Sequence, residues 1–266
     1  MTINHLDMFL NKISHDGPAL GLVVTLADPA VSELAGDAGY DFTWIDMEHM
    51  PHTLQTVQGH VIAARASGCA PFVRVPWNEP GILKPVLDLA PAGVIVPMVN
   101  SAREASAAVS ACRYPPRGIR GCGVRRAVGY GAMPFKEYLD GSAVSPLVIA
   151  QVEHVDAIEN LDEILQVEGI DHFCVGPCDL SGSMGCLNEM DDPELNRVLD
   201  ETAARIKSDG KWLGTAGGPL ERWRARGIDW IALTSDCGGI FAQARQIIEE
   251  ARKADRATKG SSPYAE

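Results

Sequence analysis

The sequence has no long hydrophobic run and no excess of positive charge. No apolar stretch approaches the roughly 18 residues that suggest a membrane-spanning helix, and the first ten residues, MTINHLDMFL, lack the basic and apolar regions of a secretory signal. The formal net charge of the 266 residues is −12, so a basic surface for nucleic acid or anionic membrane is not expected. These features predict a cytoplasmic protein that binds neither nucleic acid nor membrane.

The cysteines are odd in number, and none of them is spaced as CxxC. The seven lie at positions 69, 112, 122, 174, 178, 186 and 237. The pair Cys174 and Cys178 is four residues apart and borders a Gly-Pro turn. We therefore expect reduced and mostly buried thiols, and neither disulfides nor a structural zinc site.

Short apolar runs rich in β-branched residues recur along the chain and predict eight strands. The runs are apolar throughout and do not alternate with polar residues, which is typical of strands buried on both faces. They cover residues 20–25, 42–46, 71–75, 93–98, 147–153, 172–176, 211–215 and 229–235.

Amphipathic segments follow the strands and predict helices, because their apolar residues recur at i, i+3 and i+4. Glycines 68, 169, 210 and 227 are placed to end a helix just before a strand. The segments cover residues 29–38, 53–67, 81–90, 102–113, 155–167, 193–209, 220–226 and 240–254. Eight strand–helix units in about 250 residues predict an α/β fold, a (β/α)8 TIM barrel. We expect one domain over residues 1–255 and a polar tail at 256–266. A doubly wound open sheet is the alternative, although eight units would be long for it.

Residues 113–139 form a long segment rich in Gly, Arg and Pro after the fourth predicted helix. Long loops in compact domains are usually functional or interfacial. Its GIRGCGVRR stretch (118–126) lacks the Lys-Ser/Thr ending of a phosphate-binding P-loop. A subunit interface is therefore the favoured interpretation, and we expect the segment to end in a short helical piece.

Ionisable and polar side chains gather where the predicted strands end. In a barrel of this kind the catalytic residues lie at the C-terminal ends of the strands, so these side chains predict an active site on that rim. The set comprises Asp46, Glu48, His49, Arg74, Gln151, Glu153, Asp179, Thr234, Ser235 and Asp236.

Glu153 and Asp179 are candidate metal ligands. Two carboxylates from neighbouring strands, with no cysteine or additional histidine beside them, make an oxygen site of the kind that Mg²⁺ or Mn²⁺ prefers. The alternative is a pair of strand-end acids that cap the following helices, with Asp179 as an N-cap.

Arg74 interrupts an otherwise apolar strand, PFVRVPW. A buried arginine is rare unless it is paired. Arg74 is therefore either half of a structural ion pair with a strand-end acid or a clamp for a carboxylate or enolate, for which the planar guanidinium is suited.

The histidines near the second strand do not match a zinc-protease helix. The spacing in EHMPH differs from HExxH, and Pro51 opposes a continuous helix. A loop histidine without a catalytic role is the alternative for His49. We expect His52 and His60 at the surface or at a helix start, and His154 is as consistent with a structural role as with a functional one.

Five ordered segments carry a resemblance to a known family. Over roughly residues 18–250 the chain resembles the HpcH/HpaI family of metal-dependent (class II) pyruvate aldolases, the 4-hydroxy-2-oxoheptanedioate aldolase group. The segments are FTWIDMEHMPHTLQTVQ, VRVPWNEPGILKPVLDLAPAGVIVPMVNSAREA, RYPPRGIRGCG, QVEHVDAIENLDEILQVEGID and VGPCDLSGSMG.

The resemblance implies a barrel enzyme that reversibly cleaves 4-hydroxy-2-oxo acids to pyruvate and an aldehyde through a pyruvate enolate, in aromatic or sugar-acid catabolism. It implies that Glu153 and Asp179 bind Mg²⁺, Mn²⁺ or Co²⁺, and that Arg74 holds the keto oxygen of pyruvate and stabilises the enolate. It also implies a homo-oligomer, a hexamer or trimer, with the last helix swapped between subunits.

The same resemblance implies that His49 is the acid/base group. Its implied partners are Asp46 and an Asp88 that reaches over from a neighbouring subunit. The remaining implied substrate-binding positions are the side chain of Gln151 and the backbone of Gly176, Pro177 and Cys178.

Several alternatives remain open on the sequence. The same site could condense an oxaloacetate-derived enolate with another acceptor, as citrate-forming or macrophomate-forming relatives do, or decarboxylate oxaloacetate. A metallohydrolase would need an HxH pair at the end of the first strand, where TLADPA has no histidine. A catalytically silent barrel would have lost some of the rim residues. A Schiff-base aldolase would need an interior strand lysine, and Lys211 lies at a strand entrance. Small residues at 213–218 should widen the pocket or change the aldehyde preference.

Overall fold

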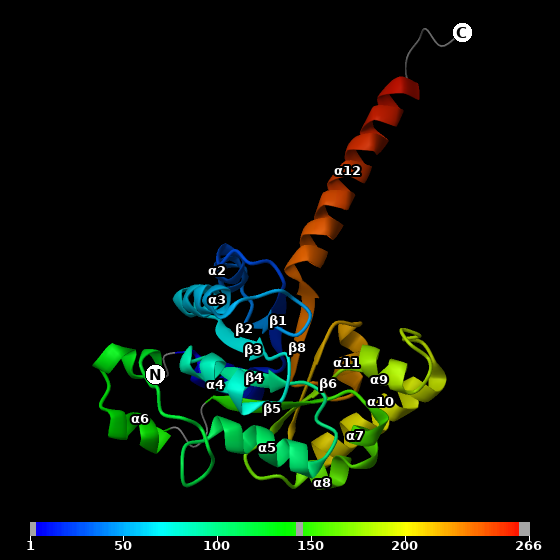
Figure 1. The fold of residues 1–266 in the computed structure, drawn as a ribbon. Helices are drawn as coiled ribbons and strands as arrows, with labels where there is room; N and C mark the ends of the chain where they lie inside the picture. Colours follow the sequence, from blue (N-terminus) through cyan, green and yellow to red (C-terminus); the bar gives the residue numbers. More distant parts are fainter. Residues whose placement is uncertain (1–3, 142–145, 261–266) are drawn as a thin grey trace.

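The computed structural model describes residues 4–141 and 146–260, of which the last seven are described by their backbone alone. The eight strands form a closed parallel barrel in chain order, and helices surround it (Figure 1). The predicted TIM barrel is confirmed, and each predicted strand run matches one strand. The strands are β1 (Ala19–Val24), β2 (Phe42–Asp46), β3 (Ala70–Arg74), β4 (Gly93–Val96), β5 (Leu147–Val152), β6 (His172–Val175), β7 (Trp212–Ala216) and β8 (Trp230–Ser235).

The helices also follow the predicted order, with some differences in extent. They are α1 (Leu6–Asn11), α2 (Ala30–Asp37), α3 (Leu54–Ala66), α4 (Pro80–Asp88), α5 (Ala102–Cys112), α6 (Phe135–Gly141), α7 (Val155–Glu159), α8 (Leu161–Leu165), α9 (Pro177–Ser183), α10 (Pro193–Ser208), α11 (Leu220–Ala225) and α12 (Asp236–Gly260). The single helix predicted at 155–167 is divided into α7 and α8 at Asn160, whose side chain donates to the backbone oxygen of Asn100 at 2.9 Å. Helices α1 and α9 were not predicted.

Aromatic rings fill the strand-entrance end of the barrel. Phe9 of α1 packs edge-on against Phe42 and Phe72, with ring centroids 5.8 and 4.8 Å away. A Cβ at Gly21 would collide with the ring of Phe42, and one at Gly214 with the indole of Trp230. These two glycines therefore make room for the aromatic layer, which closes the barrel below its active rim.

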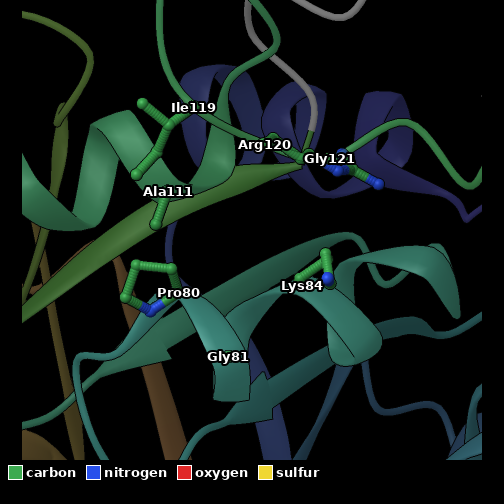
Figure 2. A pocket seen from close by; sticks show the side chains of 7 residues that line it. All are labelled: Pro80, Gly81, Lys84, Ala111, Ile119, Arg120 and Gly121. Carbon is green, nitrogen blue, oxygen red and sulfur yellow. The ribbon is translucent and has the colours of Figure 1, made fainter.

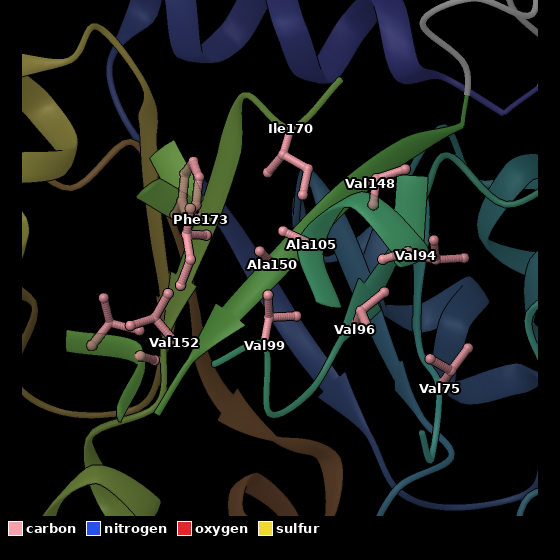
Figure 3. Packing of buried hydrophobic residues seen from close by; sticks show 14 of the residues in the cluster. Val75, Val94, Val96, Val99, Ala105, Val148, Ala150, Val152, Ile170 and Phe173 are labelled. Atoms are coloured by element: carbon pink, nitrogen blue, oxygen red, sulfur yellow. The ribbon is translucent and has the colours of Figure 1, made fainter. Parts of the chain in front are cut away.

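A second apolar layer joins the outside of the barrel to the helices (Figure 3). Strand residues such as Val94, Val96 and Val148 pack there against helix residues such as Ala105. Strand side chains thus face a core on both sides, which explains why the strand runs in the sequence are apolar throughout.

Segment 113–139 agrees with the prediction, whereas the C-terminal tail differs from it in part. Segment 113–139 contains a short 3-10 stretch, Arg126–Gly131, and ends in α6, as predicted. Helix α12 continues to Gly260, so residues 256–260 are helical, where a polar tail was expected. Residues 261–266 of that tail lie outside the described residues. In the part of the chain that is described, no helix combines the length and apolarity needed to span a bilayer.

All seven cysteines are free thiols, as predicted. The expectation that most of them are buried is wrong, because only Cys69, Cys112 and Cys174 are buried. Cys122, Cys178 and Cys237 are exposed.

His52 lies at the start of α3, as predicted, directly before the N-cap Thr53, although it is buried. The expected surface or helix-start position of His60 is wrong. His60 lies on the inner face of α3 with 0% exposure, and its Nδ1 lies 2.9 Å from the hydroxyl of Ser32. His52 packs edge-to-face on the His60 ring at 5.4 Å. Burial lowers the pKa of His60 to about 4, and the charge of His52 acts in the same direction.

This buried histidine predicts a loss of stability in mild acid. The unfolded chain binds a proton at His60 below pH 6.5, whereas the folded protein resists protonation down to about pH 4. Above pH 6.5 His60 is neutral in both states, so its burial costs no stability. As the pH falls from 6.5 towards 4, only the unfolded state takes up the proton, and the free energy of unfolding should fall, by about 2 kcal/mol at pH 5. His60→Asn should flatten the pH dependence of urea unfolding between pH 7.5 and 5 by about this amount. The partly exposed His154, changed to Asn, is the control, and an equally steep dependence in His60→Asn would contradict the assignment.

Candidate active site

The predicted rim residues meet at the C-terminal end of the barrel. Asp46 and Arg74 end adjacent strands and are register partners, and Gln151 of β5 pairs with Cys174 of β6 in the same way. Glu153 follows β5 directly and is 2% exposed. Parallel strands end at the same edge of a sheet, which is why residues over a hundred positions apart in the sequence are brought together here.

The Arg74 guanidinium is held by two acids and an aromatic ring. Its Nε and Nη2 donate to the two carboxylate oxygens of Asp46 at 2.9 and 2.7 Å. Its Nη1 lies 3.1 Å from Glu48 Oε2, and its Cζ lies 5.1 Å from the centre of the Trp44 ring. The arginine is therefore fixed in one orientation before any substrate binds, by a bidentate pair of the kind that its planar shape favours.

The two acids beside Arg74 differ in their ionisation. Burial alone would raise the pKa of Asp46, but the hydrogen bonds and charge of Arg74 outweigh it, so the pKa of Asp46 lies below its ordinary value. Burial raises the pKa of Glu48, and the charge of Arg74 only partly opposes this. Asp46 is thus the permanent counter-ion of Arg74, whereas Glu48 is held closer to protonation.

Glu153 is a buried acid with ordered oxygens. Its Oε1 accepts from the backbone N–H of Met98 at 2.8 Å, and its Oε2 accepts from the side-chain amide of Gln151. Burial raises the pKa of Glu153, opposed by these two hydrogen bonds and aided by the charge of Asp179. Met98 has a left-handed backbone, with φ of 53°, which is an uncommon conformation for a side chain of its size. In this conformation the backbone N–H of Met98 donates to Oε1 of Glu153.

A cavity of about 240 Å³ joins these groups. It is lined on one side by Arg74 and Glu153 and on the other by residues of β7 and its loop. The complete lining is Trp44, Arg74, Gln151, Glu153, Cys174, Val175, Gly176, Pro177, Cys178, Asp179, Asn188, Met190, Ala216, Gly217 and Gly218. A cavity of this size holds a small molecule of a few carbon atoms.

Glu153 and Asp179 fit a divalent cation by the chemistry of their donors. Both residues line the cavity, and the charge of Asp179 contributes to the raised pKa of Glu153, a repulsion that a cation would relieve. Within the described residues no cluster of three or more His, Cys, Asp or Glu side chains is arranged to hold a metal. A cation at this site would therefore have two protein ligands and take its other ligands from substrate or water, as Mg²⁺ commonly does. Asp179 is not the N-cap of α9, because Gly176 occupies that position.

Gly176, Pro177 and Cys178 form the start of α9 at the cavity wall. A Cβ at position 176 would lie 2.6 Å from Glu153 Oε2. Glycine is therefore needed for the backbone to pass this close to the carboxylate. The Cys178 thiol is exposed.

His49 lies at the outer edge of the site. Its side chain is 58% exposed, and its Nε2 lies 3.8 Å from Glu48 Oε2. Asp46, the predicted partner of His49, has both oxygens bonded to Arg74 instead. The contact that the structure gives His49 is thus with Glu48, whose role the sequence left open.

Asp88 is not brought to this site within one chain. It ends α4, near the strand-entrance end of the barrel, and its Oδ1 lies 3.2 Å from Arg120 Nη2. The buried Arg120 stacks on Tyr114 and lines a separate cavity of about 210 Å³ beside Lys84 of α4 (Figure 2). The predicted contact of Asp88 with His49 needs a second subunit, so a single chain leaves it a prediction.

Two residues with close contacts in the site were not singled out in the sequence. Trp44, which the sequence suggested only as barrel core, also lines the cavity beneath Arg74. The signal was available, because residue 44 lies two positions before Asp46 and shares its face of the strand. Met98 acts through its backbone, and nothing in its side chain could have indicated this.

Comparison with known proteins agrees with this geometry. The family model HpcH/HpaI aldolase/citrate lyase matches residues 19–217. A hydroxypyruvate/pyruvate aldolase of Roseobacter denitrificans is 34% identical over 91% of this chain and 96% of its own length. A 5-keto-4-deoxy-D-glucarate aldolase of Citrobacter koseri is 36% identical over 93% and 98%. The crystal structure of an HpcH/HpaI aldolase/citrate lyase family protein from Burkholderia cenocepacia superimposes with a TM-score of 0.86, at 29% identity, over 92% of this chain and 99% of that one.

The match extends over most of the chain and includes Asp46 and Arg74 at the ends of β2 and β3 and Glu153 directly after β5. The fold, the rim and these similarities lead to one conclusion. The chain belongs to the HpcH/HpaI aldolase/citrate lyase family of enzymes.

Proposed function

We propose that the protein is a metal-dependent aldolase that reversibly cleaves 4-hydroxy-2-oxo acids to pyruvate and an aldehyde. The observation that carries this proposal is that a fixed guanidinium and two carboxylates line one small cavity, those of Arg74, Glu153 and Asp179. Retro-aldol cleavage leaves a negative charge on the former keto oxygen, and an arrangement of this kind stabilises that charge.

Arg74 faces the developing enolate oxygen. The carboxylate of Asp46 neutralises part of the charge of Arg74, but it also fixes the plane of the guanidinium. Little reorganisation of the guanidinium is therefore needed when the enolate forms. Glu48, at 3.1 Å from Nη1, completes this fixation. The guanidinium keeps its proton throughout, because the hydrogen bonds and charge of Asp46 raise its pKa in spite of burial.

Glu153 and Asp179 would hold the cation. A divalent cation bound there supplies positive charge beside the carboxylate and keto oxygens of the substrate. Gln151 and the Met98 N–H orient Glu153, and hydrogen bonds of this kind to a ligand strengthen cation binding. Mg²⁺, Mn²⁺ and Co²⁺ all suit such a site, and the choice among them stays a prediction.

His49 is the proposed acid/base group. The C4 hydroxyl must lose its proton during cleavage, and imidazole titrates in the range needed for this transfer. Its exposed position at the rim suits a group that exchanges protons with solvent. A Schiff-base route finds no support, since the eight described strands contain no lysine.

The aldehyde would lie towards Ala216, Gly217 and Gly218, where the cavity wall has the smallest side chains. The similar proteins are named for different substrates, which agrees with a site whose enolate half is fixed and whose aldehyde half varies. Condensation of the enolate with another acceptor, or oxaloacetate decarboxylation, would use the same Arg74 and cation, and these are the alternative outcomes of a substrate screen.

Helix α12 supports assembly with other copies of the chain. It projects from the barrel (Figure 1) and exposes Ile240, Phe241, Ile247 and Ile248 by 49 to 68%. These positions are spaced by seven and eight residues and therefore lie on one face of the helix. We propose that this face packs on a neighbouring subunit in a hexamer or trimer. The cytoplasmic location likewise remains a prediction.

The metal proposal predicts chelator-sensitive turnover. Pyruvate release from a panel of 4-hydroxy-2-oxo acids, followed with lactate dehydrogenase, should stop with chelator and return with Mg²⁺, Mn²⁺ or Co²⁺. Glu153→Gln and Asp179→Asn should each weaken Mn²⁺ binding by about 10²-fold or more in calorimetry. The exposed acid Asp156, changed to Asn, is the control. Turnover that survives chelation would contradict the cation assignment.

The acid/base proposal predicts that His49→Ala keeps the metal and loses the chemistry. Mn²⁺ affinity should be unchanged, while kcat for cleavage falls by about 10²–10⁴-fold. His154→Ala, which removes the side-chain cap of α7, controls for loss of a nearby histidine. Full activity in His49→Ala would remove His49 from the mechanism.

The assembly proposal predicts that charge on the apolar face of α12 dissociates the oligomer. Sedimentation velocity should show an oligomer for the wild type and smaller species for Phe241→Glu combined with Ile248→Glu, because buried charges without partners are costly. Gln243→Glu, which adds charge to the same helix at an exposed polar residue, should leave the oligomer intact. A monomeric wild type would refute the proposal.

A further inference from the structure

Cations gather in segment 113–139 although the chain is acidic overall. Residues 113–134 include five arginines and no acid, whereas the formal net charge of the protein is −12. Burial lowers the pKa of Arg113, and the positive charges of Arg120 and Arg117 act in the same direction. These arginines therefore repel one another, and an anion bound beside them would reduce that repulsion.

A cavity of about 210 Å³ lies where this segment meets α4 (Figure 2). Arg120 lines it with a side chain that is 1% exposed. Its Nη2 lies 3.1 Å from the backbone oxygen of Leu87 and 3.2 Å from Asp88 Oδ1, and its Cζ lies 4.5 Å from the centre of the Tyr114 ring. The segment thus brings a cation in a fixed position to the cavity.

Lys84 brings a second cation to the cavity from α4. It is exposed, and its ammonium group has neither an ion pair nor a hydrogen bond among the described residues. A Cβ at Gly121 would lie 3.2 Å from Lys84 Cδ, so the lysine stem reaches the residue that follows Arg120. Asp88, which contacts Arg120, is a single carboxylate and offsets only part of the charge of the two cations.

The other end of the cavity is apolar. Figure 2 shows Ile119, Ala111 and Pro80 at one end and the nitrogen atoms of Lys84 and Arg120 at the other. Ile119 is 64% exposed, so it leaves apolar surface in contact with water at the edge of the cavity. Small-molecule sites commonly combine apolar walls with a few charged groups. A ligand that matches both ends has an anionic head and a short carbon chain.

We propose that this cavity binds a small organic anion, with its carboxylate or phosphate between Lys84 and Arg120 and its carbon chain against Ile119. Two cations recognise such a head group through charge-assisted hydrogen bonds. Within the described residues the cavity shares no lining residue with the active-site cavity. It is therefore a second site, whose occupant links α4 to segment 113–139, and the inference does not rest on the proposed function.

Calorimetry with three probes tests the site, at constant ionic strength and with chelator so that no cation is bound at Glu153 and Asp179. The probes are monobutyl phosphate, butyrate and inorganic phosphate. Monobutyl phosphate or butyrate should bind the wild type saturably, and the tighter of the two identifies the head group. Inorganic phosphate should bind about fivefold or more weakly than monobutyl phosphate, because it lacks the chain. Absence of saturable binding for both organic probes would overturn the inference.

Lys84→Gln tests the charged end. Because Lys84 is exposed and unpaired, its substitution should not affect folding. The Kd of the tighter organic probe should rise by about tenfold or more. Lys136→Gln is the matched control, since it changes an exposed lysine of α6 that does not line the cavity, and the Kd should stay the same. An unchanged Kd in Lys84→Gln, or an equal rise in both variants, contradicts the proposed head-group position.

Ile119→Ala tests the apolar end. The Kd of monobutyl phosphate should rise by about threefold or more, while that of inorganic phosphate stays the same, because only the former has a chain to lose contact. Leu34→Ala is the control, since Leu34 has the same exposure, 65%, and lies on α2. If monobutyl phosphate binds Ile119→Ala as tightly as the wild type, the carbon chain does not lie against Ile119 and the proposed site is wrong.

Discussion

The ion pair between Arg74 and Asp46 is the interaction on which the rest of the site depends. Both side chains are largely removed from water, with 12% and 4% of their surfaces exposed. An unpaired arginine at this depth would be strongly destabilising, and the bidentate contact offsets the cost of burying two charges. The pair also leaves Nη1 directed to Glu48 and the face of the guanidinium against Trp44. One contact thus fixes the position of the guanidinium at the cavity wall.

The barrel supplies this geometry through its strand register. Asp46 and Arg74 are register partners at the ends of β2 and β3. Glu153 comes directly after β5 and lines the same cavity as Arg74. Below them the aromatic rings of Phe42, Phe72 and Trp230 exclude water from the barrel interior. Electrostatic contacts are stronger in such surroundings than in solution. The apolar interior is therefore part of the chemistry as well as of the stability.

The sequence predicted the strands and the rim because both follow from simple physical constraints. Strands buried on two faces must be apolar throughout, so Arg74 and Glu153 stood out against their runs. The resemblance then gave roles to these residues. What could not be predicted depends on contacts between distant segments. The sequence offered Arg74 an ion pair with a strand-end acid as one alternative. Only the folded barrel shows that this acid is Asp46, so that its carboxylate contacts Arg74 and not His49.

Burial was the second kind of information that the sequence lacked. His60 lies in an amphipathic segment where a histidine can face either side, and its pairing with Ser32 of α2 is set by helix packing. Helix α1 was missed because its six residues are too few to show a period. The position of Trp44 in the cavity wall was overlooked because an aromatic residue in a strand is ordinarily core, although Trp44 shares its strand face with Asp46.

In the proposed function, Arg74 and a cation at Glu153 and Asp179 stabilise a pyruvate enolate. Exchange of the C3 protons of pyruvate with deuterium, followed by proton NMR in D₂O, reports enolate formation without any aldehyde. Exchange should be rapid with Mg²⁺ and absent with chelator. In Arg74→Lys, which cannot form the bidentate contact with Asp46, the exchange rate should fall by about 10²-fold or more. Exchange at the wild-type rate in Arg74→Lys, or exchange that persists with chelator, would contradict it.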